Sequence, residues 1–300
     1  MIEVHDLNKN YGDKIALRSV SFSVNDGEIV GLIGKNGAGK STILKSIAGL
    51  LDYDSGTIQY NGTDCKQSPG IYQNFGILIE CAFLDYFSAY DNLKLLYELN
   101  GHTSKNDITR IIDDVFELVG LSNVKHKRVK SYSFGMRQRL GLAQAIINGH
   151  TFIMLDEPFI GLDPIGKDIV KKAILKKAKE EHFSVLFSSH DLDDVAEICD
   201  RIVMIDNGKC VYNDKPKSIC EYNVYLDNND VIQSILPSLL EITNINVTSS
   251  GFSFTDSEDE SHLHTILEKV MSVAKIKRIE FSSNVLRNMF SEVAENEKNN

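Results

Sequence analysis

The chain has 300 residues, of which 42% are hydrophobic and 25% charged, and its formal net charge is −10 at pH 7. This composition is typical of a protein with a hydrophobic core, and it argues against a disordered or collagen-like chain. The longest apolar stretches are far shorter than the roughly 18–20 residues that a membrane helix needs, so we expect no membrane span. So acidic a chain is also a poor candidate for general binding to nucleic acid, and we expect no nucleic-acid partner.

The first 33 residues predict strands. Alternating apolar residues at 2–4 and 17–24 are typical of half-buried strands, and the Asn-Asp-Gly sequence at 25–27 predicts a hairpin-type turn. Residues 28–33 are almost all apolar, as in a strand buried within a parallel sheet. A glycine-rich turn follows this strand, and we expect a helix to begin near Lys40.

Strands and helices continue to alternate until about residue 215. Helical periodicity dominates residues 84–150, and short apolar strands are expected at 152–155 and 184–188, separated by a lysine-rich helix. This order predicts an α/β fold with a mostly parallel sheet, an antiparallel β subdomain and a helical insertion. We assign residues 1–215 to this domain and about 84–150 to its helical subdomain.

The pattern changes in the last stretch, residues 216–300. It predicts strands at 223–226, 242–247, 252–255 and 276–281, helices at 230–240 and 258–274, and a final helix. This β-α-β-β-α-β order favours a small α+β domain, compatible with a ferredoxin-like fold. The stretch holds 13 acidic and 7 basic residues, so it carries −6 of the net charge of −10.

The clearest chemical motif follows the buried strand at 28–33. Residues 34–42 fit the phosphate-loop pattern Gly-x-x-x-x-Gly-Lys-Ser/Thr in full. Gly37 and Gly39 let the backbone curl so that successive N–H groups face a polyphosphate, and the positive end of the next helix adds to that field. Lys40 is expected to reach the β and γ phosphates, and Ser41 to bind Mg²⁺. The candidate nucleotide-binding residues are Gly34, Asn36, Gly37, Ala38, Gly39, Lys40, Ser41 and Thr42.

Two carboxylates follow the apolar strand at 152–155. The carboxyl end of such a strand is where ligands sit in open α/β sheets. Asp156 would hold Mg²⁺ through water, as the acidic partner of a phosphate loop does. Glu157 could act as general base toward the water that attacks the γ phosphate. Two acids after an apolar strand are more often a turn or a helix cap, but beside a complete phosphate loop they favour catalysis.

Together these motifs resemble the ATP-binding cassette (ABC) ATPases, over about residues 1–215. The resemblance implies a P-loop NTPase fold, ATP hydrolysis, and ATP and Mg²⁺ as cofactors. It implies that Tyr11 stacks on adenine, although a tyrosine there is more commonly a surface or edge-strand residue. It also implies that His190 contacts the γ phosphate, where a lone histidine would usually be structural.

The same resemblance implies contacts with a second subunit. Residues 132–136, Tyr-Ser-Phe-Gly-Met, stand where the family carries its signature Leu-Ser-Gly-Gly-Gln, and only Ser133 and Gly135 match. These two residues would bind the γ phosphate of an ATP held by the other subunit; the alternative is an ordinary serine-capped helix. A dimer contact is implied for Gly161, Leu162 and Asp163.

One residue departs from the usual pattern. After the expected strand at 76–79, the family usually has a glutamine that touches Mg²⁺ and the attacking water, and this chain has Glu80. With the altered signature, Glu80 resembles the branch that exports bacitracin, lantibiotics and similar peptides, often as self-immunity. The resemblance thus makes Glu80 a candidate metal-contacting and catalytic residue.

The resemblance implies the ATP-hydrolysing subunit of a transporter, which forms a homodimer on ATP and drives a separate membrane permease. Such a subunit would be cytoplasmic and peripheral on the inner face of the cell membrane, and a helical region near residues 81–92 would meet the permease.

An alternative is a soluble cassette ATPase acting on nucleic acid or ribosomes. Those relatives carry coiled-coil insertions or two cassettes, whereas this chain shows one cassette, no heptad run and an acidic tail. A small-molecule kinase would leave the signature, Asp163 and His190 unexplained. The tail from about 216 is expected to be an accessory unit.

Overall fold

The computed structural model describes residues 1–80, 82–100, 105–149, 151–216, 219–227, 232–240, 242–243, 245–257 and 262–283. The chain divides into two compact units, Met1–Lys215 and Pro216–Asn300, and each is described here by itself. Within the described ranges, no helix combines the length and the apolar character needed to cross a membrane.

A six-stranded sheet forms the centre of the first unit. Its strand order is β10-β9-β3-β8-β7-β6, and only β10 runs antiparallel to its neighbour. Every residue of β3, β7 and β8 is buried, as expected for strands covered on both faces. The strands are β3 (Ile29–Ile33), β6 (Phe75–Leu78), β7 (Phe152–Leu155), β8 (Ser184–Ser189), β9 (Arg201–Asp206) and β10 (Lys209–Asp214). The mostly parallel α/β fold is therefore confirmed.

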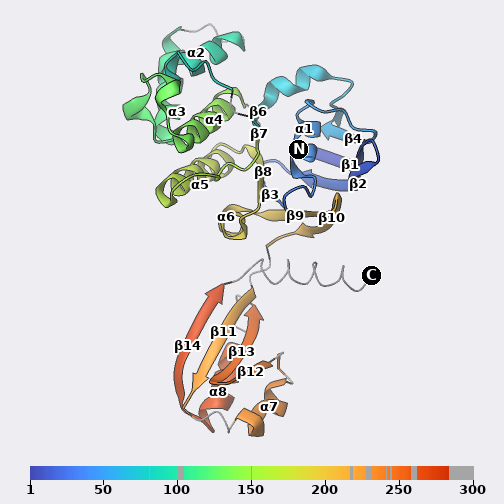
Figure 1. Ribbon diagram of the computed structural model, residues 1–300, viewed down its shortest axis with the longest axis vertical. Coiled ribbons are helices and arrows are strands. Elements are labelled where there is room, and N and C mark those ends of the chain that lie inside the picture. The colour runs from blue at the N-terminus through green and yellow to red at the C-terminus, as the bar shows by residue number, and fades with distance from the viewer. Residues whose placement is uncertain are drawn as a thin grey trace. The chain divides into compact units, whose positions relative to one another are not determined.

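A second, antiparallel sheet covers one side of the first (Figure 1). Its order is β2-β1-β4-β5, and with the helix α1 it encloses a core that includes Leu17, Leu32 and Ile43. The elements are β1 (Ile2–Tyr11), β2 (Lys14–Val24), β4 (Ser55–Tyr60), β5 (Thr63–Asp64) and α1 (Lys40–Ile47).

The prediction of a hairpin at 25–27 is wrong, because the strands on either side of this turn belong to different sheets. The tight turn that joins β1 to β2 is Gly12 and Asp13, where Gly12 has the positive φ of 58° that such turns need. Residues 25–27 instead carry the chain from the antiparallel sheet into β3 of the central sheet. The wholly apolar β3 is buried between two parallel strands, so it does not pair back onto β2, which has a solvated face.

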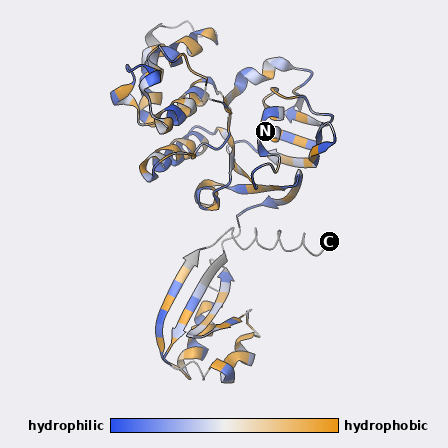
Figure 2. Ribbon diagram, in the orientation of Figure 1, coloured by the Kyte–Doolittle hydropathy of each residue, from blue (hydrophilic) through white to orange (hydrophobic). Residues whose placement is uncertain are grey.

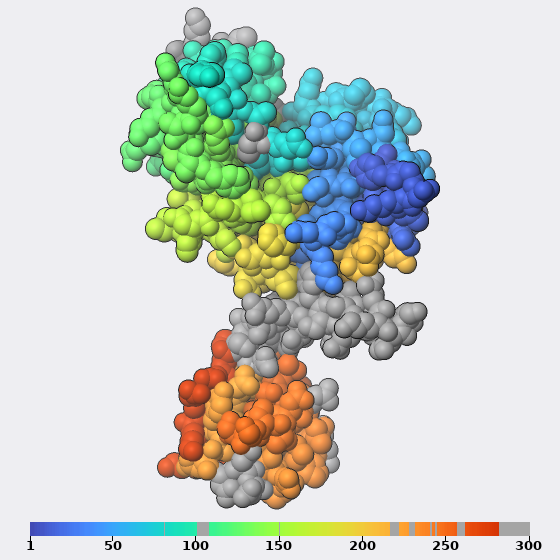
Figure 3. Space-filling model, in the orientation of Figure 1, coloured from blue at the N-terminus to red at the C-terminus, as the bar shows by residue number. Residues whose placement is uncertain are grey.

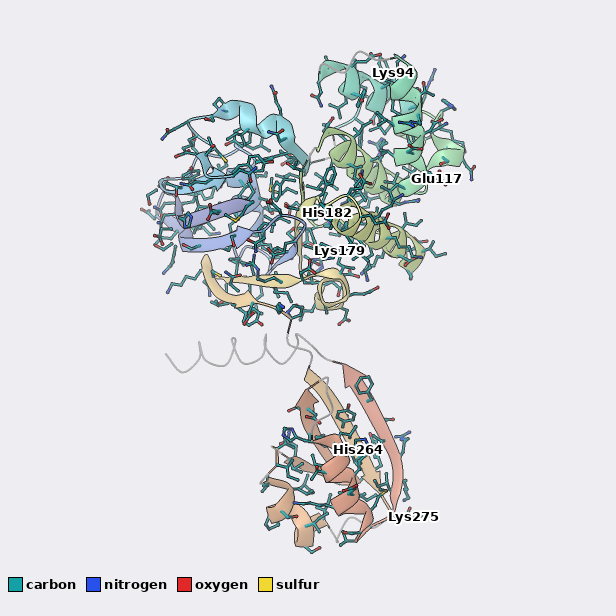
Figure 4. All side chains as sticks on the ribbon, turned by 180° about the vertical axis from the view of Figure 1, so that it is seen from behind. Lys94, Glu117, Lys179, His182, His264 and Lys275 are labelled. Carbon is teal, nitrogen blue, oxygen red and sulfur yellow. The ribbon has the colours of Figure 1, made fainter. Side chains whose placement is uncertain are left out.

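Helices cover the other side of the central sheet (Figure 1). They are α2 (Ala89–Leu99), α3 (Lys105–Leu118), α4 (Phe134–Asn148), α5 (Pro164–Lys179) and α6 (Leu192–Ile198), with short 3-10 helices at Ser122–Val124 and Val129–Ser131. A further 3-10 helix, Pro69–Asn74, packs instead on the core between α1 and the antiparallel sheet. Helices α2 and α3 pack on α4 and form a lobe beside the β-rich part (Figure 3). Lys94 on α2 and Glu117 on α3 lie in this lobe (Figure 4), and its helices carry both hydrophobic and hydrophilic residues (Figure 2).

The helical region expected near 81–92 begins later than predicted. The described residues 82–88 form a loop, and α2 begins at Ala89. Ser88 sets this start because its side chain accepts a hydrogen bond from the Asp91 N–H at 3.0 Å. The loop is also hydrogen-bonded to the segment before α4, for example from the Val129 N–H to the Phe87 carbonyl at 3.0 Å.

The second unit is a four-stranded antiparallel sheet with two helices. Its elements in chain order are β11 (Ile219–Leu226), α7 (Ile232–Leu240), β12 (Ile245–Thr248), β13 (Gly251–Ser257), α8 (Leu263–Met271) and β14 (Ile276–Ser283). The strand order β12-β13-β11-β14 is that of a split β-α-β, ferredoxin-like fold. Strand β14 carries both hydrophobic and hydrophilic residues (Figure 2). The expected final helix lies outside the described residues.

An arginine ties the start of β3 to the start of β9. The Arg201 Nε donates to the Glu28 Oε1 at 2.7 Å, and Nη2 donates to the other carboxylate oxygen at 2.9 Å and to the Ser23 carbonyl at 2.6 Å. The side chains of Arg201 and Glu28 are only 15% and 13% exposed. Burial alone would raise the pKa of Glu28, but the hydrogen bonds and charge of Arg201, together with the Asn25 N–H, outweigh it and lower that pKa.

We expect Arg201→Met to lower the free energy of unfolding by about 3 kcal/mol at pH 7, because it leaves a buried carboxylate without its cation. The pKa of Glu28 is lower in the folded chain than its ordinary value of 4.5. The pair's contribution is therefore complete above that value and is lost as the pH falls through the folded pKa. Urea unfolding at pH 7 and at pH 4 should show the difference between the two proteins shrinking at the lower pH.

The control for this measurement is Lys172→Met, which breaks the exposed Lys172–Asp168 pair at 2.7 Å and should cost less than about 0.5 kcal/mol. Equal unfolding free energies for Arg201→Met and Lys172→Met would contradict the structural role of Arg201.

Candidate functional site

Four neighbouring strands of the central sheet end at one edge. In the order β3-β8-β7-β6 they are parallel, so their carboxyl ends point the same way. The phosphate loop follows β3, His190 follows β8, the two carboxylates follow β7, and Glu80 follows β6. Residues far apart in the chain therefore meet where ligands bind in open α/β sheets.

The phosphate loop leaves its backbone open to a cavity. Gly37 has a φ of 84°, and a Cβ built on it would have no atom within 4 Å. Gly39 has a φ of 116° and precedes α1 with no side-chain cap, so the first N–H groups of that helix receive no side-chain hydrogen bond at this position. The cavity of about 300 Å³ is lined by Tyr11, Lys14, Ala16, Asn36, Gly37, Gly39, Lys40, Ser41, Thr42 and Glu157.

Lys40 is a buried cation whose hydrogen-bond partners belong to the loop itself. Its side chain is 7% exposed, and its Nζ donates to the carbonyls of Gly34 at 2.6 Å and Lys35 at 3.4 Å. The Glu157 Oε1 lies 3.8 Å from the same nitrogen. A buried cation beside open N–H groups is the arrangement that binds a phosphate chain, so these residues fit a nucleotide.

The buried Ser188 positions both acidic residues that follow β7. Its hydroxyl donates to the Asp156 Oδ1 and accepts from the Glu157 N–H, the latter at 2.8 Å. The Asp156 N–H in turn donates to the Leu78 carbonyl of β6 at 2.6 Å. The two carboxylates therefore sit at defined positions between β6 and β8.

Glu157 has a left-handed backbone, with a φ of 48°. This conformation is unfavourable for a residue with a side chain and is often found at functional sites. The Gln138 Nε2 from α4 donates to the Glu157 carbonyl at 3.1 Å, so Ser188 and Gln138 hold this residue at both backbone groups. Its carboxylate lies between Lys40 and His190, with the His190 Nδ1 2.8 Å from Oε2.

Glu80 lies at the same edge but is paired with a lysine from α1. The Lys45 Nζ donates to the Glu80 Oε1 at 2.9 Å. This hydrogen bond and the lysine's charge lower the pKa of Glu80, and the same contact raises the pKa of Lys45. Glu80 also lines a second cavity together with Asp156 and Glu157.

The residues at this edge fit a magnesium–nucleotide complex better than a metal held by protein alone. Among the described residues, no group of three or more His, Cys, Asp or Glu side chains could hold a metal ion. Magnesium at a phosphate loop needs fewer protein ligands because phosphates and waters supply the rest. Ser41 lines the nucleotide cavity, and Asp156 and Glu80 line the neighbouring one, so hydroxyl and carboxylate oxygens are available.

Tyr11 stands at the end of β1 and lines the cavity of the phosphate loop. Its side chain is exposed, and the Lys9 Nζ lies 5.5 Å from the centre of its ring. An exposed aromatic ring at the rim of a phosphate cavity is available for stacking on a base.

Ser133 and Gly135 lie at the start of α4 on either side of Phe134, which lines the second cavity. In the described part of the chain, neither is among the residues that line the two cavities. Ser133 caps α4, since its hydroxyl accepts from the Met136 N–H at 3.3 Å. A Cβ on Gly135 would come within 3.2 Å of Leu162, so this helix start packs directly on the loop that holds Gly161 and Leu162. The structure thus brings together the residues for which a partner contact is expected.

Asp163 ends that loop and caps α5. Its side chain accepts from the Gly166 N–H at 2.8 Å, and Pro164 occupies the first turn, where a missing N–H costs nothing.

Several residues of the site were not found from the sequence, namely Ser188, Gln138 and Lys45. Ser188 and Ser189 are polar residues at the carboxyl end of β8, directly after three apolar residues, and this change is the signal that could have marked Ser188. Lys45 stands four residues after Ser41, hence on the same face of α1. Nothing in the local sequence marks Gln138, because its partner Glu157 is on another element.

Comparison with known proteins identifies the family. The family model described as ABC transporter matches residues 17–160. The chain is 32% identical over 302 residues to the bacitracin transport ATP-binding protein BcrA of Enterococcus faecalis, covering 100% of this chain and 93% of that protein. It is 36% identical over 211 residues to the lantibiotic transport ATP-binding protein SrtF of Streptococcus pyogenes, covering 70% and 89%.

Solved structures of the same fold agree. The chain resembles cbiO1 from Clostridium perfringens, part of an ABC transporter complex, with a TM-score of 0.65 and 26% identity over 72% of this chain and 88% of that one. A dimeric bacterial ABC transporter cassette gives a TM-score of 0.67 at 22% identity over 72% and 98%, which shows the fold. The chain therefore belongs to the ATP-binding proteins of ABC transporters and is the subunit that binds and hydrolyses ATP.

Proposed function

We propose that two copies of this chain close on two Mg²⁺–ATP molecules and drive the export of a peptide antibiotic through a separate membrane permease. The observation that carries this substrate class is the similarity to a bacitracin transport protein along the whole chain, including the second unit. Glu80, at the position where the wider family has glutamine, supports the same branch. The permease would hold the subunit at the inner face of the cell membrane.

In this proposal Glu157 is the general base for hydrolysis. Its carboxylate accepts a proton from the water that attacks the γ phosphate, and its hydrogen bond with His190 fixes the direction in which it points. Lys40 exchanges the Gly34 carbonyl for the β and γ phosphates when ATP enters. Ser41 and Asp156, with Glu80 beside them, would hold Mg²⁺, which when bound neutralises charge on the phosphate oxygens.

We assign the second half of each ATP site to the partner copy. The start of α4 offers the Ser133 hydroxyl and the Gly135 N–H at a positive helix end, which suits a γ phosphate. The loop with Gly161, Leu162 and Asp163 packs beside it, so one surface would meet the partner. A dimeric cassette among the structural neighbours supports this arrangement.

The permease contact is assigned to an apolar groove beside Glu80. The groove has a volume of about 230 Å³ and is lined by Ala82, Phe83, Leu84, Asn92, Leu93, Leu95, Leu96, Leu99 and Gln144. Ala82 lies two residues beyond Glu80, so a helix seated in the groove would act directly on the site. We further propose that residues 1–215 contain the complete ATPase and that 216–300 form an accessory domain.

Glu157→Gln should trap an ATP-bound dimer. The amide cannot take the proton of the attacking water, so ATP hydrolysis should fall by about 10³-fold while ATP binding persists. Size-exclusion chromatography of the full chain with and without Mg²⁺–ATP measures the dimer. A variant that stays monomeric in ATP would count against the scheme.

Glu80→Gln should lower ATP hydrolysis by about tenfold, or about 1.4 kcal/mol in the barrier, and should reduce peptide resistance in cells. The substitution removes a negative charge beside Asp156 and leaves Lys45 without its ion-pair partner. Glu181→Gln is the control, because Glu181 pairs with Lys177 at 2.6 Å away from the site. Normal ATPase activity together with normal resistance in Glu80→Gln would remove the functional meaning of this residue.

Leu95→Asp should abolish co-purification with the membrane permease, because a charge cannot enter an apolar groove without losing its hydration. ATP hydrolysis by the isolated subunit should stay within about twofold, since the groove lies outside the phosphate cavity. Val211→Asp is a matched control, as Val211 and Leu95 are 41% and 37% exposed. Equal permease recovery with both variants would place the contact elsewhere.

A further inference from the structure

Two lysines on α5 share one buried carboxylate of α6. The Lys167 Nζ lies 2.6 Å from the Asp194 Oδ2, and the Lys171 Nζ lies 3.0 Å from Oδ1 of the same residue, whose side chain is 5% exposed. Only Lys167 also reaches Asp191, at 3.0 Å from its Oδ2, whereas Lys171 pairs with Glu197. The two lysines therefore contribute alike to the packing of α5 on α6, but only one of them touches the residue next to His190.

Asp191 is fixed at several points. Its Oδ1 accepts from the Asp193 N–H at 3.1 Å and caps α6, and its own N–H donates to the Ser189 hydroxyl at 3.0 Å. The Ser189 hydroxyl donates back to the Asp191 carbonyl at 3.2 Å. His190 stands between these two residues, so the loop that holds Ser189 and Asp191 also sets the backbone of His190.

His190 depends on that loop because little else holds it. Its side chain is 53% exposed, and its hydrogen bond to Glu157 is at 2.8 Å. A half-exposed imidazole has no packed core to fix its position, so its direction follows from the backbone on which it stands. The Lys167 contact is a link to that backbone from α5, the helix that begins next to Asp163.

The charges of this link are stable at neutral pH. Burial works against the charged form of Lys167, but hydrogen bonds to Asp194 and Asp191 outweigh it and raise the pKa of Lys167. Burial likewise works against ionised Asp191, but the hydrogen bond and charge of Lys167 outweigh it and lower the pKa of Asp191.

We propose that Lys167 is a positioning residue for ATP hydrolysis: it holds Asp191 from α5 and thereby keeps His190 directed at Glu157. The inference rests on the proposed roles of Glu157 and His190. Lys167 would also connect the loop of Gly161, Leu162 and Asp163 to the catalytic site. Its N–H donates to the Asp163 carbonyl at 2.9 Å, one helical turn away. A shift of Asp163 on dimer closure would move Lys167, and with it the loop of His190.

The test measures kcat and the KM for ATP of the full chain. Lys167→Met should lower kcat by about tenfold and leave the KM within about twofold, because the residue acts on the reacting geometry and not on ATP binding. Lys167→Arg should restore most of the activity, since it keeps the charge and the donors. Lys171→Met is the matched control: it removes a cation from the same Asp194 without touching Asp191, and its kcat should stay within about twofold of wild type.

Asp191→Asn tests the contact from the other side. Asparagine still caps α6 and leaves both lysines on Asp194, so the fold is kept, while kcat should fall as in Lys167→Met. In a His190→Ala background, Lys167→Met should cause no further loss, because its effect passes through His190.

Equal losses in Lys167→Met and Lys171→Met would show a structural role only and would overturn the proposal. An additional loss in the His190→Ala background would do the same. A normal kcat for His190→Ala alone would overturn the proposed role of His190 together with this inference, whereas an impaired His190→Ala beside a normal Lys167→Met would overturn the inference alone.

Discussion

The buried hydroxyl of Ser188 sits between two neighbouring strands and contacts both acidic residues that follow β7. The hydroxyl donates a hydrogen bond to the Asp156 carboxylate and accepts one from the Glu157 N–H. A single oxygen therefore fixes the positions of both residues relative to each other. This contact requires β7 and β8 to be adjacent and in register, with Leu155 opposite Phe187. It also holds the left-handed backbone of Glu157, a conformation that costs about 1–3 kcal/mol and persists only where its surroundings fix it.

Glu157 joins the phosphate loop to the end of β8. Its carboxylate lies between Lys40 and His190, while Lys40 is satisfied by carbonyls of the phosphate loop. Nucleotide phosphates would compete with Glu157 for Lys40, which frees the carboxylate to face the attacking water. In the proposed mechanism one ligand both fills the cavity and changes the partners of Glu157, so ATP binding would be coupled to the assembly of the hydrolytic site.

Local patterns predicted the parts of the site that are continuous in the chain. The phosphate loop at 34–42 and the strand before Asp156 depend on glycine spacing and on short apolar runs, which a sequence displays directly. The contacts of Ser188, Lys45 and Lys167 join residues on different elements, and sheet order rather than periodicity brings them together. No local signal carries that order.

The hairpin turn predicted at 25–27 and the helix predicted near 81–92 were wrong for the same reason: contacts with distant parts of the chain decide both structures. The Asn-Asp-Gly sequence at 25–27 forms a turn, but the next strand, β3, joins a different sheet from β2. The turn is therefore not part of a hairpin. Residues 82–88 are partly apolar and were expected to be helical, yet their backbone bonds to the segment before α4 and Phe83 and Leu84 line a groove. In the second unit, by contrast, alternating strands and amphipathic helices were enough to predict the order of the described elements, and the sheet adopts the strand order of that fold.

In the proposed dimer, each ATP lies between two copies of the chain. The most direct measurement is the structure of the full chain with Mg²⁺ and a non-hydrolysable ATP analogue. We expect the Ser133 hydroxyl and the Gly135 N–H of one copy to lie about 3 Å from the γ phosphate that Lys40 of the other copy binds. A nucleotide whose γ phosphate contacts one copy only, with Ser133 of both copies facing solvent, would contradict it.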